Sequence, residues 1–267
     1  MKMVKKILLG LVVLATAFAF SGCTKDDTQG AISGTGKKYS VSYTNDTTDA
    51  YRAYKATALK HAGGLVKVTF KDPTKASSSK IGVIFDLKDA VSGVKDAKGK
   101  AAKDFYAIAI GMENDGCFYV SQFTDIVDIQ AKNFGATTTA KEKEPKEVEI
   151  VAYNKTRGNA LKLPAAAADG SISLYIWYMA LPTGQYSWAI YDLTDEQASQ
   201  YDSTLGTFKV AVTPLDGGII DKAFEAPTDP TKVPQNPIAF YAQVAPNTTL
   251  TGGWNVIGTY KEAEDAE

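Results

Sequence analysis

From Tyr39 to Tyr260 the sequence breaks into short segments in which apolar and polar residues alternate, and this period of two limits the available folds more than any other feature. Successive side chains of a strand point to opposite faces, so the alternation indicates sheets with one buried face. Turn formers such as Pro182-Thr183-Gly184 separate the segments. The expected strands are Tyr39–Tyr43, Leu65–Phe70, Ile81–Leu87, Phe105–Met112, Cys117–Phe123, Glu147–Tyr153, Ser171–Ala180, Tyr186–Asp192, Thr207–Val212, Ile238–Val244 and Gly253–Tyr260.

Many short strands with close turns predict an all-β fold, an antiparallel β-sandwich of the jelly-roll or concanavalin-like kind. Thr194 and Gln197 have the spacing of a capping box, which predicts a short helix running up to Tyr201. The stretch Asp49–Ala62 fits both a helical stripe and a strand alternation, and its β-rich surroundings favour the strand. Neither a repeat nor a break in composition divides the chain, so one domain is expected over residues 39–262, before an acidic tail at 263–267.

The composition excludes several functional classes. Lys and Arg total 29 against 30 Asp and Glu, for a net charge of −1, so the chain has no long-range field to gather nucleic acid, and no such partner is expected. One His and two Cys supply neither a His-rich metal site nor a zinc cluster, so no metal or cofactor is assigned. A calcium site formed by carboxylate and amide oxygens of the loops remains an alternative.

The first 22 residues have the order of a secretory signal peptide: a basic start, an uncharged apolar run over 7–20, and Ser21-Gly22 before Cys23. As a helix, the apolar run spans about 21 Å, short of the roughly 30 Å of a bilayer core. Small residues directly before a Cys resemble a bacterial lipoprotein signal, in which Cys23 becomes the lipidated N-terminus. Phe20 in place of the usual Leu resembles the relaxed signals of spirochaetes. The alternative is plain secretion with an incidental thiol at Cys23.

Residues 23–38 have almost no apolar side chains and cannot offset their own ordering entropy, so they are expected to form a flexible tether. Three long loops are expected further on, at Lys88–Asp104, Lys132–Lys146 and Thr213–Pro237. The last contains five prolines and reads as an extended surface connection that could border a binding site.

The clearest local pattern is a hairpin of Ser171–Ala180 and Tyr186–Asp192. If Ala180 pairs with Tyr186, the two faces of the hairpin differ sharply. The core face then carries Ile172, Leu174, Ile176, Tyr178, Trp188 and Ile190. The other face carries Ser171, Ser173, Tyr175, Trp177, Met179, Ser187 and Tyr191.

The second face mixes aromatic planes with hydroxyls, which is the chemistry of a sugar-binding surface. Tyr175, Trp177 and Tyr191 are therefore candidate ligand-binding residues. Alternatively these rings pack beneath a crossing loop or a second sheet, and a slip of one residue would exchange the faces. Trp254 is a fourth candidate, because Gly252-Gly253 before it could let a ligand approach the backbone; a bulge or turn explains these glycines equally well.

No residue is assigned a catalytic role. His61 is the only histidine, and no motif supplies the partner that a general base needs, so a surface or capped histidine is the favoured interpretation. Cys117 is expected to be a small buried hydrophobe. The carboxylates near Asp125 and Glu147 do not match the Glu-x-Asp-x-x-Glu strand of sandwich glycosidases.

Three stretches carry a resemblance to a known family: Arg52-Ala53-Tyr54-Lys55, Ile81–Leu87 and Phe118-Tyr119-Val120-Ser121. They resemble members of the spirochaetal, Treponema-type predicted lipoprotein families, whose β-rich mature domains have no assigned enzymatic activity. The resemblance implies an envelope or surface location and carries over no binding residue. The expected architecture also resembles carbohydrate-binding modules and concanavalin-like sandwiches, a likeness of fold that does not establish function.

Together these features predict a lipid-anchored protein of the bacterial envelope, at the outer membrane, whose sandwich is a non-catalytic binding module for carbohydrate. The expected partners are the membrane, through the lipid at Cys23, and a glycan or a host or envelope macromolecule. Two alternatives stay open: a structural or adhesive protein-interaction lipoprotein, and an unrecognised sandwich-fold glycoside hydrolase.

Overall fold

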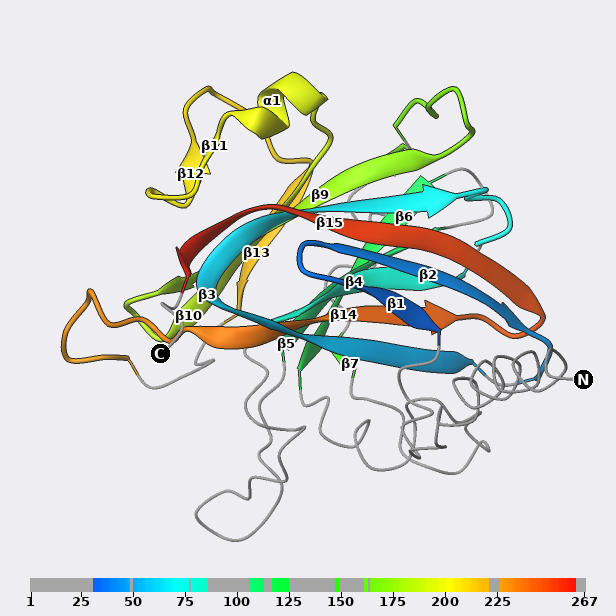
Figure 1. The fold of residues 1–267 in the computed structure, drawn as a ribbon, viewed down its shortest axis with the longest axis horizontal. Coiled ribbons are helices and arrows are strands. Elements are labelled where there is room, and N and C mark those ends of the chain that lie inside the picture. The colour runs from blue at the N-terminus through cyan, green and yellow to red at the C-terminus, as the bar shows by residue number, and fades with distance from the viewer. Residues whose placement is uncertain are drawn as a thin grey trace, which may run out of the picture.

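In the computed structural model the described residues are 31–48, 50–76, 78–85, 106–112, 117–124, 147–148, 161–162, 164–220 and 226–262. They form antiparallel strands and one short helix, α1 (Asp195–Ser199) (Figure 1). The strands are β1 (Ile32–Thr35), β2 (Lys38–Asn45), β3 (Tyr51–Lys71), β4 (Lys80–Phe85), β5 (Tyr106–Met112), β6 (Cys117–Thr124), β7 (Glu147–Val148), β8 (Leu161–Lys162), β9 (Ile172–Leu181), β10 (Gln185–Tyr191), β11 (Tyr201–Asp202), β12 (Thr207–Phe208), β13 (Asp216–Ile220), β14 (Asn236–Val244) and β15 (Thr248–Glu262).

The long strand β3 belongs to both layers of the sandwich. Its first half pairs with β14, which leads through β4, β5 and β6 to the short strands β7 and β8; this is the first sheet. Its second half lies between β15 and β9 in the second sheet, which has the order β1-β2-β15-β3-β9-β10-β13. Figure 1 shows β3 bending sharply where it passes from one layer to the other.

Large side chains of the two sheets meet face to face in the core. Phe85 of β4 stacks on Tyr178 of β9 with ring centroids 5.1 Å apart. Phe240 of β14 lies 4.5 Å from the ring of Tyr39 in β2, and 5.3 Å from that of Trp254 in β15. Burial of this apolar surface is the main stabilising contribution, because each large side chain gains about 1.5–3 kcal/mol on leaving water.

Glycine is required at the bend of β3. A Cβ on Gly63 would lie 2.7 Å from the carbonyl oxygen of Tyr178 in the neighbouring strand β9. The strands can therefore approach closely here only because Gly63 lacks a side chain. His61, two residues earlier, is buried, and its ring hydrogen-bonds to the hydroxyl of Tyr178.

Several sequence-based predictions of structure are confirmed. The fold is an all-β antiparallel sandwich, and the ambiguous stretch before Ala62 lies in strand β3. Ala180 pairs with Tyr186, which is the predicted hairpin register. The helix after Thr194 forms, with the capping box closed in both directions between Thr194 and Gln197.

The predicted tether and the last predicted loop are corrected. Residues 31–38 are not a tether, because Ile32–Thr35 pairs with β2 and Ile32 is only 1% exposed, so the folded region begins by Ala31 rather than at Tyr39. The stretch Thr213–Pro237 contains β13, which pairs with β10. The expected strand Thr207–Val212 forms only over Thr207–Phe208.

Other predictions concern residues outside the described ranges: the signal peptide with Cys23, the loops at 88–104 and 132–146, and the tail at 263–267. Among the described residues, no helix has the length and apolar character needed to cross a bilayer.

Candidate functional site

The outward face of the second sheet is divided into a covered part and an open part. Over β9 and β10 it is covered by the segment between β10 and β13, residues 192–215, which we call the covering segment. This segment contains α1, β11 and β12, which stand above β9 in Figure 1. Over β1, β2, β15 and the end of β3 the same face is open to solvent.

The predicted aromatic row lies beneath the covering segment. Tyr175 is 1% exposed and packs with Leu65 and with Leu193, Ala198 and Tyr201 of the segment. Trp177 and Tyr191 are half-buried in the same cluster. The prediction of an open aromatic platform is therefore corrected in favour of the alternative in which the rings pack beneath a crossing segment.

Polar contacts hold the covering segment in register. The indole Nε1 of Trp177 donates to the carbonyl oxygen of Gly206 at 2.7 Å. The Oδ1 of Asp195 accepts from the hydroxyl of Tyr175 at 3.1 Å and from the ammonium of Lys67 at 2.9 Å. The hydroxyl of Tyr175 and the indole N–H of Trp177 are thus engaged within the protein.

The pair of Lys67 and Asp195 marks the boundary between the covered and open parts of the face. The hydrogen bonds from Lys67 and Tyr175 lower the pKa of Asp195 below its usual range. Burial is the largest single influence on Lys67 and disfavours its charged form, but the interactions with Asp195 and Tyr175 together outweigh it and raise the pKa of the ammonium. Both groups stay charged at neutral pH and largely neutralise each other.

The fourth candidate, Trp254, faces the core rather than a ligand. It is 3% exposed, and its Nε1 donates to the carbonyl oxygen of Gly82 in the opposite sheet at 2.9 Å. The prediction that its ring is a ligand platform is corrected because the ring is almost entirely enclosed by the core, although Trp254 is among the residues that line the shallow depression over Gly252 and Gly253. The two glycines before it are half-buried, and their backbone lines a depression at the surface.

The open part of the sheet carries hydroxyl groups in lateral rows. Residues opposite each other in an antiparallel sheet share one face. The register sets Ser33 beside Ser40, Ser40 beside Gly253, Gly253 beside Thr69, and Thr69 beside Ser173, across five strands. We call the open surface the hydroxyl face; its members are Ser33, Ser40, Ser42, Thr44, Thr69, Ser173, Thr249, Thr251 and Asn255.

Hydrogen bonds link neighbouring hydroxyls of this face. The Oγ atoms of Ser33 and Ser40 are 3.2 Å apart, and Oγ1 of Thr69 lies 2.9 Å from Oγ of Ser173. A hydroxyl has one donor and two acceptor positions, so each of these groups keeps capacity for a further partner from solvent.

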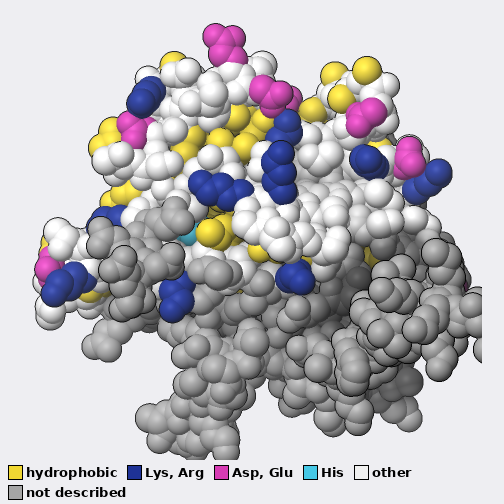
Figure 2. Space-filling model, in the orientation of Figure 1, with side chains coloured by type: hydrophobic (Ala, Val, Ile, Leu, Met, Phe, Trp, Pro, Cys, Tyr) yellow, Lys and Arg dark blue, Asp and Glu magenta, His cyan; other side chains and the backbone are white. Residues whose placement is uncertain are grey.

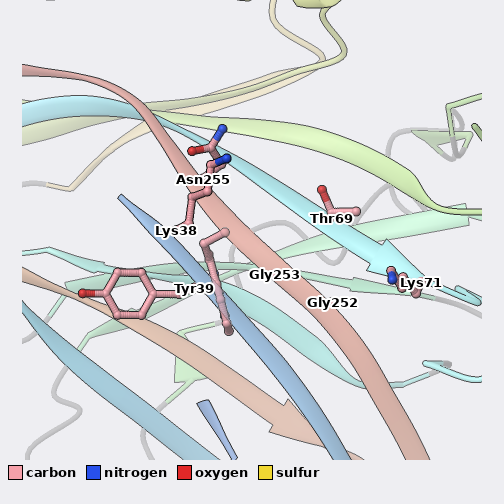
Figure 3. A pocket seen from close by; sticks show the side chains of 8 residues that line it. Lys38, Tyr39, Thr69, Lys71, Gly252, Gly253 and Asn255 are labelled. Carbon is pink, nitrogen blue, oxygen red and sulfur yellow. The ribbon is translucent and has the colours of Figure 1, made fainter. Parts of the chain in front are cut away.

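A shallow depression of about 250 Å³ lies over Gly252 and Gly253 at the centre of the hydroxyl face. Its rim includes Lys38, Thr69, Lys71 and Asn255. Figure 3 shows Thr69 and Asn255 rising on one side of the strands, while Tyr39 points away from them. The missing side chain of Gly253 opens a gap in the hydroxyl rows, so a ligand there can approach the backbone.

Sequence reasoning missed the hydroxyl face, although part of its signal was present. Ser40, Ser42 and Thr44 alternate with buried or half-buried residues along β2, which is visible in the sequence. The rest of the signal is the register that brings Thr69 and Ser173 beside them, and those residues are distant in sequence.

The other candidate chemistry finds no site in the described part of the chain. Within those ranges, no three His, Cys, Asp or Glu side chains cluster in a way that could hold a metal ion. His61 is a capped core histidine bonded to Tyr178, and burial raises the pKa of that tyrosine hydroxyl well above its usual value.

Comparisons with known proteins give no family for this chain. No family model matches, and no curated protein matches. Among solved structures, a legume lectin-like domain from Entamoeba histolytica is 9% identical with a TM-score of 0.38, over 85% of this chain and 87% of that one. The CBM2 module of the evolved Dit of Lactobacillus casei BL23 phage J-1 is 8% identical with a TM-score of 0.28, over 86% and 77%. At these values the likenesses carry no argument about ligand or activity.

Proposed function

We propose that this protein is a non-catalytic carbohydrate-binding module that holds its ligand on the hydroxyl face. The observation that carries the proposal is the open array of Ser, Thr and Asn side chains around the Gly252-Gly253 depression. Hydroxyl and amide groups both donate and accept hydrogen bonds, as the hydroxyls of a sugar do. They hold a polyol and leave its covalent bonds intact, so we propose binding without bond chemistry.

The depression suits an extended ligand that lies flat on the sheet. Its floor is the backbone at Gly252 and Gly253, and its rim carries the short polar side chains of Thr69 and Asn255 beside the long ones of Lys38 and Lys71. The contact is polar rather than aromatic, because the rings of Tyr175 and Trp177 are covered. Affinity per sugar residue is then expected to be modest, since each hydrogen bond contributes about 0.5–1.5 kcal/mol net.

The test is a glycan array with the chain from residue 24 onward, which contains the whole described fold. The double variant Thr69→Val with Asn255→Ala removes one hydroxyl and one amide from the rim of the depression and is expected to weaken binding about tenfold, the sum of two hydrogen bonds. Thr207→Val is the matched control, because Thr207 is exposed on the covering segment and away from the hydroxyl face. Equal binding by the double variant and the control would contradict the proposal.

A Trp177→Phe variant separates this site from the aromatic row. It removes the indole donor to Gly206 and keeps an aromatic ring. If glycan binding falls in Trp177→Phe and is unchanged in the Thr69 and Asn255 variant, the ligand binds at the aromatic row under the covering segment instead.

The proposed location is the outer membrane of the bacterial envelope, with the module anchored through lipid on Cys23. Support comes from the sequence order of basic residues, apolar run and Ser21-Gly22-Cys23. Each buried CH₂ contributes about 0.8 kcal/mol, so several acyl chains make release rare. Metabolic labelling is expected to put acyl chains on the wild-type protein in a globomycin-sensitive way. Undiminished labelling of Cys23→Ser would refute the anchor.

Protein interaction is a second candidate, favoured by apolar side chains exposed between residues 205 and 219. Leu205 is 64% exposed and Ile219 54%, and Val210 and Leu215 are also exposed. Exposed apolar groups gathered in one segment are typical of contact surfaces. This candidate would replace the first if the array shows no glycan binding.

A further inference from the structure

We infer that the ligand of the hydroxyl face is an acidic polysaccharide, an inference that rests on the proposed carbohydrate-binding function and adds its charge class. The lysines decide the charge of the face. Lys38 and Lys71 stand on the rim of the depression, and Lys67 occupies the next outward position along β3. The register rows of the hydroxyl face contain no carboxylate.

The three lysines are not equivalent. Lys67 is neutralised by Asp195, whose carboxylate lies 2.9 Å from its ammonium. Lys38 and Lys71 are exposed; the hydrogen bonds from Ser171 lower the pKa of Asp169, and the charge of Lys71 adds a smaller contribution in the same direction. In the view of Figure 2, dark blue side chains lie near the middle of the described surface, and magenta ones lie toward its upper, left and right edges.

The placement of Lys38 and Lys71 sets the form of the ligand. Lys38 is opposite Asn255, and Lys71 is opposite Thr251, so the two lysines are four residues apart along β15 and on opposite sides of it. This corresponds to about 13 Å along the strand and about 10 Å across it. These offsets are between backbone positions, so two extended lysine side chains can present charges at well separated points of the face. A chain with repeated negative groups can contact both ammonium groups, while its hydroxyls lie over the rows between them.

Neutral and acidic forms of one polymer test the inference directly. We expect polygalacturonate to bind the chain from residue 24 onward about tenfold more tightly than its methyl ester, which has the same sugar backbone without charge. The preference is expected to shrink as NaCl rises from 50 to 500 mM, because salt screens exposed charges. Oligogalacturonates are expected to gain affinity with length until they reach both lysines, and then to level off.

Variants identify the charges responsible. Lys38→Gln with Lys71→Gln is expected to abolish the preference for the acid over the methyl ester. Lys232→Gln is the matched control, since this exposed lysine lies in the segment before β14 and outside the hydroxyl face. A preference that survives in the double variant overturns the inference.

The outcomes separate the two levels of the proposal. If the acid and the ester bind equally well and the Thr69 and Asn255 variant binds neither, the carbohydrate-binding function is kept and the acidic ligand class is rejected. Absence of binding to either polymer, and to heparin and its desulfated form, rejects both. Binding to vesicles containing phosphatidylglycerol without binding to any polymer also rejects both, and assigns the lysines to a membrane surface.

Discussion

Replacing Trp254 with alanine is expected to destabilise the domain by about 3–5 kcal/mol, the range measured for large aromatic side chains removed from cores. Trp254 is 3% exposed and packs on Phe240, which belongs to the opposite sheet. The substitution opens a cavity between the layers and removes the donor to the carbonyl oxygen of Gly82. Urea unfolding followed by circular dichroism measures the loss.

Trp254→Phe is the control that separates packing from hydrogen bonding. It keeps an aromatic ring against Phe240, removes the indole donor and leaves a smaller cavity than alanine does, so about 1–3 kcal/mol of the loss is expected to remain. If Trp254→Ala lowers the free energy of unfolding by less than 1 kcal/mol, the ring is not part of the core.

Replacing Gly82 with alanine is expected to cost about 3 kcal/mol or more, the upper end for overpacking. A Cβ on Gly82 would lie 2.2 Å from the carbonyl oxygen of Ile108 and 2.6 Å from the Cα of Ala109. Both atoms are backbone of the neighbouring strand β5, so no side-chain rotation relieves the clash. Since β4 is paired on both sides, by β14 and β5, it cannot move away without breaking a ladder.

Gly170→Ala provides the comparison. Gly170 has a positive φ of 77°, and a Cβ there would meet nothing within 4 Å. That variant is expected to lose only about 1 kcal/mol from backbone strain. Equal melting temperatures for Gly82→Ala and Gly170→Ala would show that β4 and β5 separate more readily than their register implies.

Short-range features of the structure could be predicted from the sequence. The hairpin register followed from Pro182-Thr183-Gly184 and the alternation beside it, and the capping box followed from Thr194 and Gln197. Both depend on residues close in sequence, whose geometry is set by local hydrogen bonds and side-chain alternation.

Features that depend on distant partners could not be predicted in this way. Alternation showed that Tyr175 and Trp177 share a face of β9, and it did not show that residues 193–208 return to cover them. The strand β1 was missed because its polar side chains are typical of a tether, and only its pairing with β2 makes Ile32 a core residue. The hydroxyl face likewise needs a register that spans five strands.

The central position of β15 constrains how the polypeptide reaches its native state. This strand lies between β2 and β3, so the second sheet has a gap until residues 248–262 have been synthesised. Before then, both neighbours present unpaired backbone groups that can associate with other chains. Sheet formation through contacts so remote in sequence is slow. A nascent chain of this topology therefore avoids aggregation if it is kept unfolded until its last strand is available.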